Sequence, residues 1–160
     1  MIGVETDVGE QWERRIDWPA LARSAVHAAV AHSRHKGLAD SEVSVKFTSD
    51  EEVRSLNGAW RGKDRPTNVL SFPMAGKDEL ADAQLLGDIV LAHGVCAAEA
   101  ADKAVGIETH AAHLVVHGTL HLLGYDHETS DEDAEEMEQA ERRALASLGI
   151  ADPYEVTELQ

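Results

Sequence analysis

The sequence predicts an α+β fold, a single compact domain in which a small mixed β-sheet packs with about five helices. Its 160 residues suit one domain, and a hydrophobic content of 43% is enough for a real core. Segments typical of strands lie in the first part of the chain, whereas the second part has mostly helical spacing. No repeat or linker divides the sequence, so we expect one domain over 1–160.

Strands and helices are expected to alternate in the first part of the chain. Val43, Val45 and Phe47 alternate with polar residues, which is typical of one face of a strand. Gly37 is a natural stop for the helix that precedes them. The expected strands are 2–8, Glu42–Thr48, 69–72 and Leu85–Ala92, and the expected helices are 18–36 and a short one capped by Ser49 or Asp50. The polar segments 61–67 and 76–83 are expected to be loops.

Three helices are expected in the second part of the chain. The first is predicted at 95–105, and the second, 107–123, carries apolar residues on more than one side and should be buried. A last helix, capped within 129–131, is predicted to end near Ser147. Its acidic residues are predicted to form a solvated face: Glu132, Asp133, Glu135, Glu136, Glu138 and Glu141.

Charge and composition limit the functions to consider. The 14 Lys and Arg residues against 30 Asp and Glu give a net charge of −16, which argues against a general nucleic-acid coat but allows one basic pocket. The chain has one cysteine, an acidic N-terminus, and no stretch that approaches the ~20 apolar residues of a membrane span. We therefore expect a soluble, cytoplasmic protein.

The segment HGTLHLLGYDH, residues 117–127, predicts a metal site at the end of the buried helix. His117 and His121 are four residues apart, so both imidazoles leave one face of a helix. Gly124 favours a left-handed turn that ends the helix, and the returning chain can bring His127 to the same ion. Three imidazoles with one open position are typical of a catalytic zinc, so we predict one Zn²⁺ per chain.

Other side chains near this segment have more than one interpretation. His113 also lies four residues from His117, and we expect it to support the site or to pack. Asp126 can orient a ligand imidazole, act as a base, or stabilise the turn. Asp126 and Cys96 are the candidates for a fourth ligand, although Cys96 is better explained as a small buried residue. The remaining histidines are interpreted as structural: His27, His32, His35, His93 and His110.

The histidine spacing also matches the metalloprotease pattern H-E-x-x-H-x-x-G-x-x-H. The general-base glutamate of that pattern would occupy position 118, where this chain has Gly118. A peptidase of this type needs that carboxylate beside its metal-bound water. The sequence therefore argues against a peptidase, although the histidine spacing still predicts the same metal geometry.

A basic segment follows the short helix. Arg61, Lys63 and Arg65 lie within five positions, and guanidinium groups bind phosphate oxygens well. Trp60 can stack on a nucleobase. The alternative is a solvated loop that Trp60 anchors in the core.

These motifs together resemble the YbeY family of bacterial metal-dependent endoribonucleases. The resemblance covers 56–127 and is carried by R-x-K-D-x-P-T-N-V-L-S-F-P, L-G-D-I-V and H-G-x-L-H-L-L-G-Y-D-H. It implies a compact α+β domain, zinc on His117, His121 and His127, and a functional arginine at Arg61. It also implies cleavage of single-stranded RNA, maturation of the 3′ end of 16S rRNA, ribosome biogenesis and ribosome quality control. The implied partners are an rRNA precursor, small-subunit ribosomal proteins and a ribosome-associated GTPase.

The resulting hypothesis is a zinc-dependent endoribonuclease. His117, Arg61 and Asp126 are its candidate catalytic residues, and Arg61, Lys63 and Arg65 are its candidate RNA contacts. Two alternatives stay open: a zinc hydrolase of another substrate class, such as a metalloprotease, and a non-enzymatic ribosome-assembly factor. The zinc of an assembly factor would be structural, with a fourth protein ligand in place of water.

Overall fold

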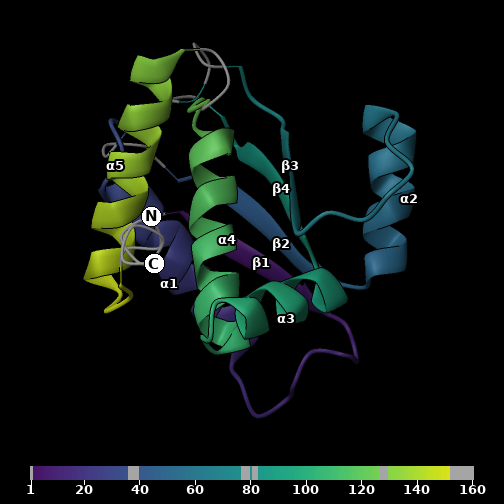
Figure 1. The fold of residues 1–160 in the computed structure, drawn as a ribbon. Helices are drawn as coiled ribbons and strands as arrows, with labels where there is room; N and C mark the ends of the chain where they lie inside the picture. The colour runs from purple at the N-terminus through teal and green to yellow at the C-terminus, as the bar shows by residue number, and fades with distance from the viewer. Residues whose placement is uncertain (1, 36–39, 77–79, 81–82, 127–129, 152–160) are drawn as a thin grey trace.

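The computed structural model describes residues 2–35, 40–76, 80, 83–126 and 130–151. Four strands form one mixed sheet, and five helices are described around it (Figure 1). This arrangement confirms the predicted α+β class. In chain order the elements are β1 (Gly3–Val8), α1 (Trp18–Ala31), β2 (Glu42–Thr48), α2 (Asp50–Arg61), β3 (Val69–Pro73), β4 (Leu85–Ala92), α3 (His93–Asp102), α4 (Ile107–Leu122) and α5 (Asp131–Ser147).

The sheet has the order β1-β2-β4-β3. The pairs β1–β2 and β2–β4 are parallel, and the connections between them pass through helices, as parallel neighbours require. β3 pairs antiparallel with β4 in a register that sets Leu70 beside Val90. Because β3 is an edge strand, its last residue, Pro73, costs no inner hydrogen bond of the sheet.

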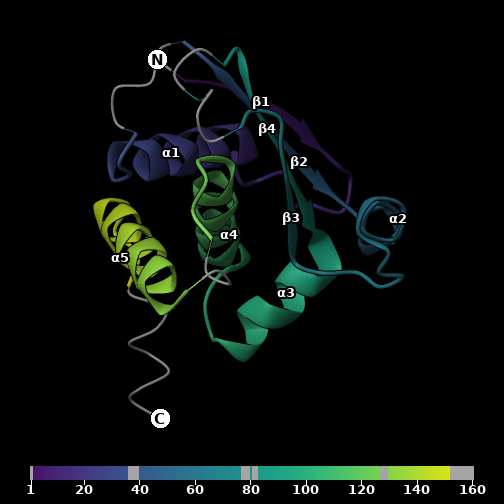
Figure 2. The ribbon, with the colours of Figure 1, turned by 90° about the horizontal axis from the view of Figure 1, so that it is seen from above.

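The two faces of the sheet are covered unequally. α1, α4 and α5 lie on one side, where the main core is formed, and α2 lies on the other side (Figure 2). Beneath α2 a smaller apolar cluster contains Val53, Leu70 and Val90. α4 contacts α1, α5, α3 and the strands β3 and β4, so it is the central helix of the molecule. The prediction that this helix is buried is confirmed.

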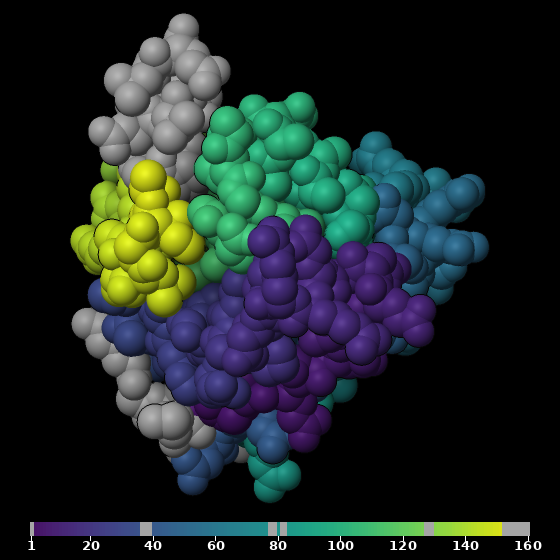
Figure 3. Space-filling model, turned by 90° about the horizontal axis from the view of Figure 1, so that it is seen from below, coloured from purple at the N-terminus to yellow at the C-terminus, as the bar shows by residue number. Residues whose placement is uncertain are grey.

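The residues between β1 and α1 cover the lower end of the core. In the space-filling view from below, the purple N-terminal part of the chain lies in the middle of the face, with yellow α5 at the left and the green part of the chain above it (Figure 3). Under this cover Trp12 stacks edge-on against Trp18 and Phe47. The indole Nε1 of Trp12 donates to the carbonyl of Thr48, 3.0 Å away, which satisfies the only polar atom of a fully buried ring. None of the described helices is long and apolar enough to cross a membrane.

The strand predictions agree with the structure to within one residue, whereas two helix boundaries differ. β2 and β4 have the predicted bounds. α1 ends at Ala31 rather than at residue 36, because the Ser33 hydroxyl binds the Val30 carbonyl and competes with further helical bonds. α3 spans His93–Asp102 rather than 95–105, and Ala104 after it has a left-handed φ of 55°.

The predicted solvated face of α5 is wrong at one residue. Glu141 is 0% exposed, although most of the other acidic residues of that helix are exposed or half-buried as expected. The reason lies in the helical period: Glu141 stands four residues after Met137 and four before Leu145, both of which are buried against the core. A residue on that stripe faces α4 whatever its charge.

Candidate functional site

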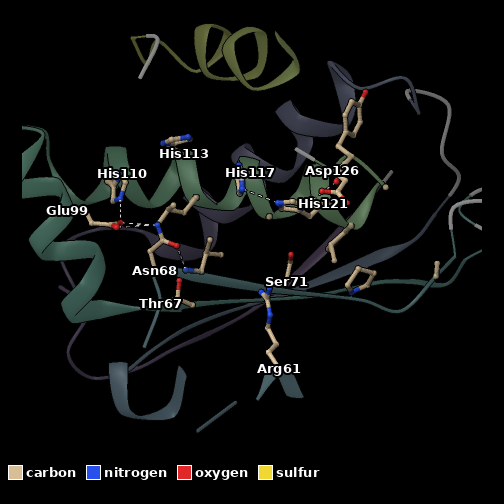
Figure 4. A pocket seen from close by; sticks show the side chains of 18 of the residues that line it. Arg61, Thr67, Asn68, Ser71, Glu99, His110, His113, His117, His121 and Asp126 are labelled. Carbon is tan, nitrogen blue, oxygen red and sulfur yellow. Dashed lines mark hydrogen bonds and ion pairs between the residues drawn. The ribbon is translucent and has the colours of Figure 1, made fainter. Parts of the chain in front are cut away.

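A cavity of about 790 Å³ lies between α4 and β3, beside the end of α2. Figure 4 shows its histidines following one another along α4, with Arg61 reaching toward Ser71 from the opposite side. The predicted site residues that line it are Arg61, His117, His121 and Asp126. His113, His110, Glu99 and Lys103 line it as well.

The predicted histidine pair is brought together. His117 and His121 stand one turn apart near the end of α4, and their ring centroids are 4.6 Å apart. Their Nε2 atoms approach to 3.0 Å. The two imidazoles therefore converge on one point of the cavity, as the four-residue spacing predicts.

The turn after α4 has the predicted left-handed glycine. Gly124 has a φ of 92°, and its N–H binds the carbonyl of His121 at 3.0 Å. The next N–H, of Tyr125, returns to the carbonyl of Leu120 at 3.0 Å. These two bonds form a Schellman motif, which ends the helix and reverses the chain. His127 lies outside the described residues, so its predicted place at the metal stays a prediction.

The Nδ1 atoms of the converging histidines both face acceptors. His117 Nδ1 is hydrogen-bonded to the carboxylate of Glu141, and His121 Nδ1 lies 3.1 Å from the carbonyl oxygen of Tyr125. Since neither acceptor carries a proton, each ring donates through Nδ1, and a neutral ring then has its Nε2 lone pair toward the other ring. Two such nitrogens at 3.0 Å repel each other unless a proton or a cation lies between them. This donor set fits a borderline metal such as Zn²⁺.

Among the described residues no group of three His, Cys, Asp or Glu side chains has the geometry of a metal site. Two predicted ligands are described, and the predicted third is His127. The half-buried Asp126 follows the turn and lies beside His121 in the cavity wall (Figure 4). Cys96, the other candidate for a fourth ligand, does not line the cavity, and its Sγ lies 3.7 Å from the carbonyl oxygen of Asn68.

Glu141 is the site residue that the sequence analysis missed. Its carboxylate contacts His117 Nδ1 and, at 3.5 Å, His113 Nε2. Burial raises the pKa of this carboxyl, but the hydrogen bonds from His113 and His117 outweigh burial and hold the pKa below its ordinary value. The signal that could have found it is its place on the apolar stripe of α5.

The basic residues separate into one that faces the cavity and two that do not. Arg61 is the last residue of α2 rather than part of a loop, and Gly62 ends that helix with a left-handed φ of 67°. Lys63 and Arg65 are exposed and do not line the cavity. Trp60 is 73% exposed, so the interpretation that it anchors the loop in the core is wrong.

The far end of the cavity holds a second polar group. His110 Nε2 lies 2.8 Å from Glu99 Oε1, and the same carboxylate accepts from the Asn68 amide at 3.0 Å. Burial is the main cause that lowers the pKa of His110, which keeps this imidazole neutral near pH 7. The Asn68 side-chain oxygen accepts from the N–H of Val69 at 2.7 Å. This network joins the start of β3 to α3 and α4.

Packing explains why position 118 is glycine. Gly118 is buried on α4, and a Cβ there would lie 3.1 Å from Ile89 Cγ2 on β4. A side chain at this position requires the Ile89 side chain to shift by a few tenths of an ångström. The close approach of α4 to Ile89 at this position favours glycine.

The fold and the site define a small α+β protein with paired histidines and an opposing arginine in one cleft. Residues 8–149 match the family described as "Endoribonuclease YbeY". The chain belongs to this YbeY family of endoribonucleases.

Similar proteins agree with this assignment. The chain is 51% identical to the endoribonuclease YbeY of Novosphingobium aromaticivorans, with 96% of each chain covered. It is 52% identical to that of Rhizorhabdus wittichii, with 99% of each covered. Among solved structures it is similar to TM1509 from Thermotoga maritima, with a TM-score of 0.57, 26% identity, and coverage of 96% of this chain and 98% of the other.

Proposed function

We propose that this chain is a zinc-dependent endoribonuclease that cuts single-stranded RNA during maturation of the 3′ end of 16S rRNA. The observation that carries the proposal is the convergence of two imidazole Nε2 atoms, 3.0 Å apart, in a cleft that Arg61 faces. Membership of the YbeY family supports RNA as the substrate. We include ribosome biogenesis and quality control in the proposed role, in the cytoplasm.

His117, His121 and His127 are the residues proposed to hold the zinc. The Nδ1 partners of the first two, Glu141 and the Tyr125 carbonyl, fix the rings so that Nε2 is the binding atom. When bound, zinc supplies Lewis acidity and makes a coordinated water nucleophilic near neutral pH.

The other residues act on the RNA itself. Arg61 stands opposite the histidines, where its guanidinium can bind the phosphate oxygens and stabilise the charge that develops during cleavage. The exposed Trp60 ring, one residue earlier, offers a surface on which a base can stack. Asp126 is proposed to accept the proton of the attacking group, because it lies at the histidine end of the cavity.

Because the chain is strongly negative, we propose that partner molecules help to bring the RNA to it. A net charge of −16 repels RNA from most of the surface, so phosphates are expected to approach only along the side of Arg61, Lys63 and Arg65. Small-subunit ribosomal proteins and a ribosome-associated GTPase are proposed to bring the rRNA precursor to this side. Lys63 and Arg65 would guide the strand from outside the cleft.

The test is cleavage of matched single-stranded and duplex RNA by the full chain, with zinc and with a chelator. We expect cleavage of the single strand alone and loss of cleavage with the chelator. Arg61→Glu should keep zinc and lose cleavage, whereas Arg143→Glu, which makes the same charge change at an exposed position outside the cleft, should cleave as wild type does. Full cleavage by a zinc-loaded Arg61→Glu variant would contradict the role of Arg61.

A further inference from the structure

We propose that Glu141 is a positioning residue for His117, and that His113 holds it in place. In this role the carboxylate on α5 selects the imidazole tautomer that binds metal and increases the affinity of the site. The inference rests on the metal-binding part of the proposed function and adds residues from a helix that no sequence motif indicates.

The first argument is the cost of burying the charge. Glu141 is 0% exposed on a helix whose other acidic residues reach solvent or the boundary of the protein. A buried carboxylate is stable only where strong hydrogen bonds replace its water. Its two oxygens contact His117 and His113, both on α4. The contact between α5 and α4 is therefore built around the histidines.

The second argument is the direction of the proton. A carboxylate accepts hydrogen bonds and does not donate them, so the bond to Glu141 requires the proton of His117 on Nδ1. In the neutral ring the lone pair is then on Nε2, the atom that lies 3.0 Å from His121 Nε2. The opposite tautomer would place a proton where the metal is to bind. A negative charge on the far side of the ring also makes Nε2 a stronger donor to a cation.

The third argument gives His113 a role. It stands one turn before His117 on α4, and its Nε2 lies 3.5 Å from Glu141 Oε2. The carboxylate is thus held between two imidazoles that differ in position. Both histidines line the cavity; His117 converges with His121 there, while His113 contacts the second carboxylate oxygen.

The experiment compares Glu141→Gln and Glu141→Leu with a matched control, Glu138→Gln. Glu138 lies on the same helix, one turn earlier, and is 40% exposed beside Arg142, so its neutralisation should change nothing at the site. Zinc affinity is measured by competition with a chromophoric chelator on the full chain. Nitrogen NMR of the imidazoles in the metal-free chain reports the tautomer of His117 independently of activity.

We expect Glu141 substitutions to weaken zinc binding by about 10- to 100-fold, the usual effect of removing a partner of a metal-binding histidine. Glu141→Gln keeps an acceptor and loses the charge, so it should show the smaller loss. Glu141→Leu should also shift the metal-free His117 away from the Nδ1–H tautomer. If the leucine variant is unfolded by circular dichroism, the glutamine variant and its affinity carry the test.

Two results would overturn the inference. One is an unchanged tautomer together with a zinc affinity within about twofold of wild type in the folded variants. The other is a wild-type chain that binds no zinc, which would also remove the metal from the proposed function. Zinc binding that depends on Glu141 in a chain that does not cut RNA would support the inference and contradict the proposed RNA cleavage alone.

Discussion

Among the histidine–glutamate pairs described along α4, burial is reversed between His110–Glu99 and His117–Glu141. In the His110–Glu99 pair the imidazole is 2% exposed and the carboxylate 37%, whereas in the His117–Glu141 pair the values are 24% and 0%. The nitrogen that is engaged also differs: Nε2 in His110 and Nδ1 in His117. The same two residue types therefore give a neutral structural histidine in one place and a candidate metal ligand in the other.

The difference shows that whether a histidine can bind a cation depends less on which residue is its partner than on which ring nitrogen faces the cavity. At His110 the Nε2 atom is bonded to Glu99, and Asn68 shares the same carboxylate, so the group joins β3 to the helices. At His117 the carboxylate lies behind the ring, and Nε2 points toward the second imidazole. Only this second arrangement is suited to binding a cation.

The largest effect is expected from His117→Ala. Removing this ring should abolish measurable zinc binding and lower RNA cleavage by more than about 100-fold, because a bound metal supplies several kcal/mol of charge stabilisation and each ~1.4 kcal/mol is a factor of ten. Zinc content by mass spectrometry and cleavage rate are measured on the same preparation.

His110→Gln is the matched variant for the other pair and should keep its zinc. A His117→Ala chain that retains both zinc and cleavage would remove the distinction between the two pairs. Equal loss of zinc in both variants would show that the pairs act as one unit.

A smaller effect, on stability rather than chemistry, is expected from His110→Gln. Losing the buried imidazole should lower the free energy of unfolding by about 1–3 kcal/mol at pH 7.5. The carboxylate of Glu99 loses a hydrogen-bond partner, and the packing of the buried ring is lost. Burial lowers the pKa of His110 in the folded chain, so its contribution is complete above the unfolded pKa of about 6.5 and decreases as the pH falls toward the folded pKa.

Urea unfolding of wild type and His110→Gln at several pH values measures this effect. The difference in unfolding free energy between the two chains should be largest above pH ~6.5 and should shrink on acidification. Glu99, His113 and Lys103 also act on this imidazole, so the slope is compared at one ionic strength. A difference that grows as the pH falls would mean that the His110–Glu99 pair is stabilised as an ion pair instead.

The sequence predicts the histidine end of the site well, because the sequence signals for this part are local. The spacing of His117 and His121 and the turn at Gly124 depend on one helix and its end, and both are found as predicted. The same holds for the strands Glu42–Thr48 and Leu85–Ala92, where alternating or continuous apolar residues define the faces. Short-range geometry needs no knowledge of tertiary packing.

The parts that were wrong depend on contacts between distant segments. Glu141 lies 24 residues from His117, and its charge suggested solvent although its helical position faces α4. Trp60 can be interpreted from the sequence as a stacking surface or as an anchor of the loop, and in the last turn of α2 it is 73% exposed. Helix phase determines the environment of Glu141, whereas Trp60 shares a helix face with Val53 and is exposed because it stands in the last turn of α2.

The smallest effect is expected from Cys96→Ala. Burial raises the pKa of this thiol to about 12. Its Sγ contacts the carbonyl of Asn68, the residue whose side chain binds Glu99 beside His110. The thiol should therefore stay protonated and react with disulfide reagents only as fast as the chain opens. The alanine variant should bind zinc within about twofold of wild type, because Cys96 belongs with His110 rather than with His117. A tenfold weaker zinc affinity, or rapid labelling that zinc blocks, would instead make Cys96 a ligand and place it with His117 rather than with His110.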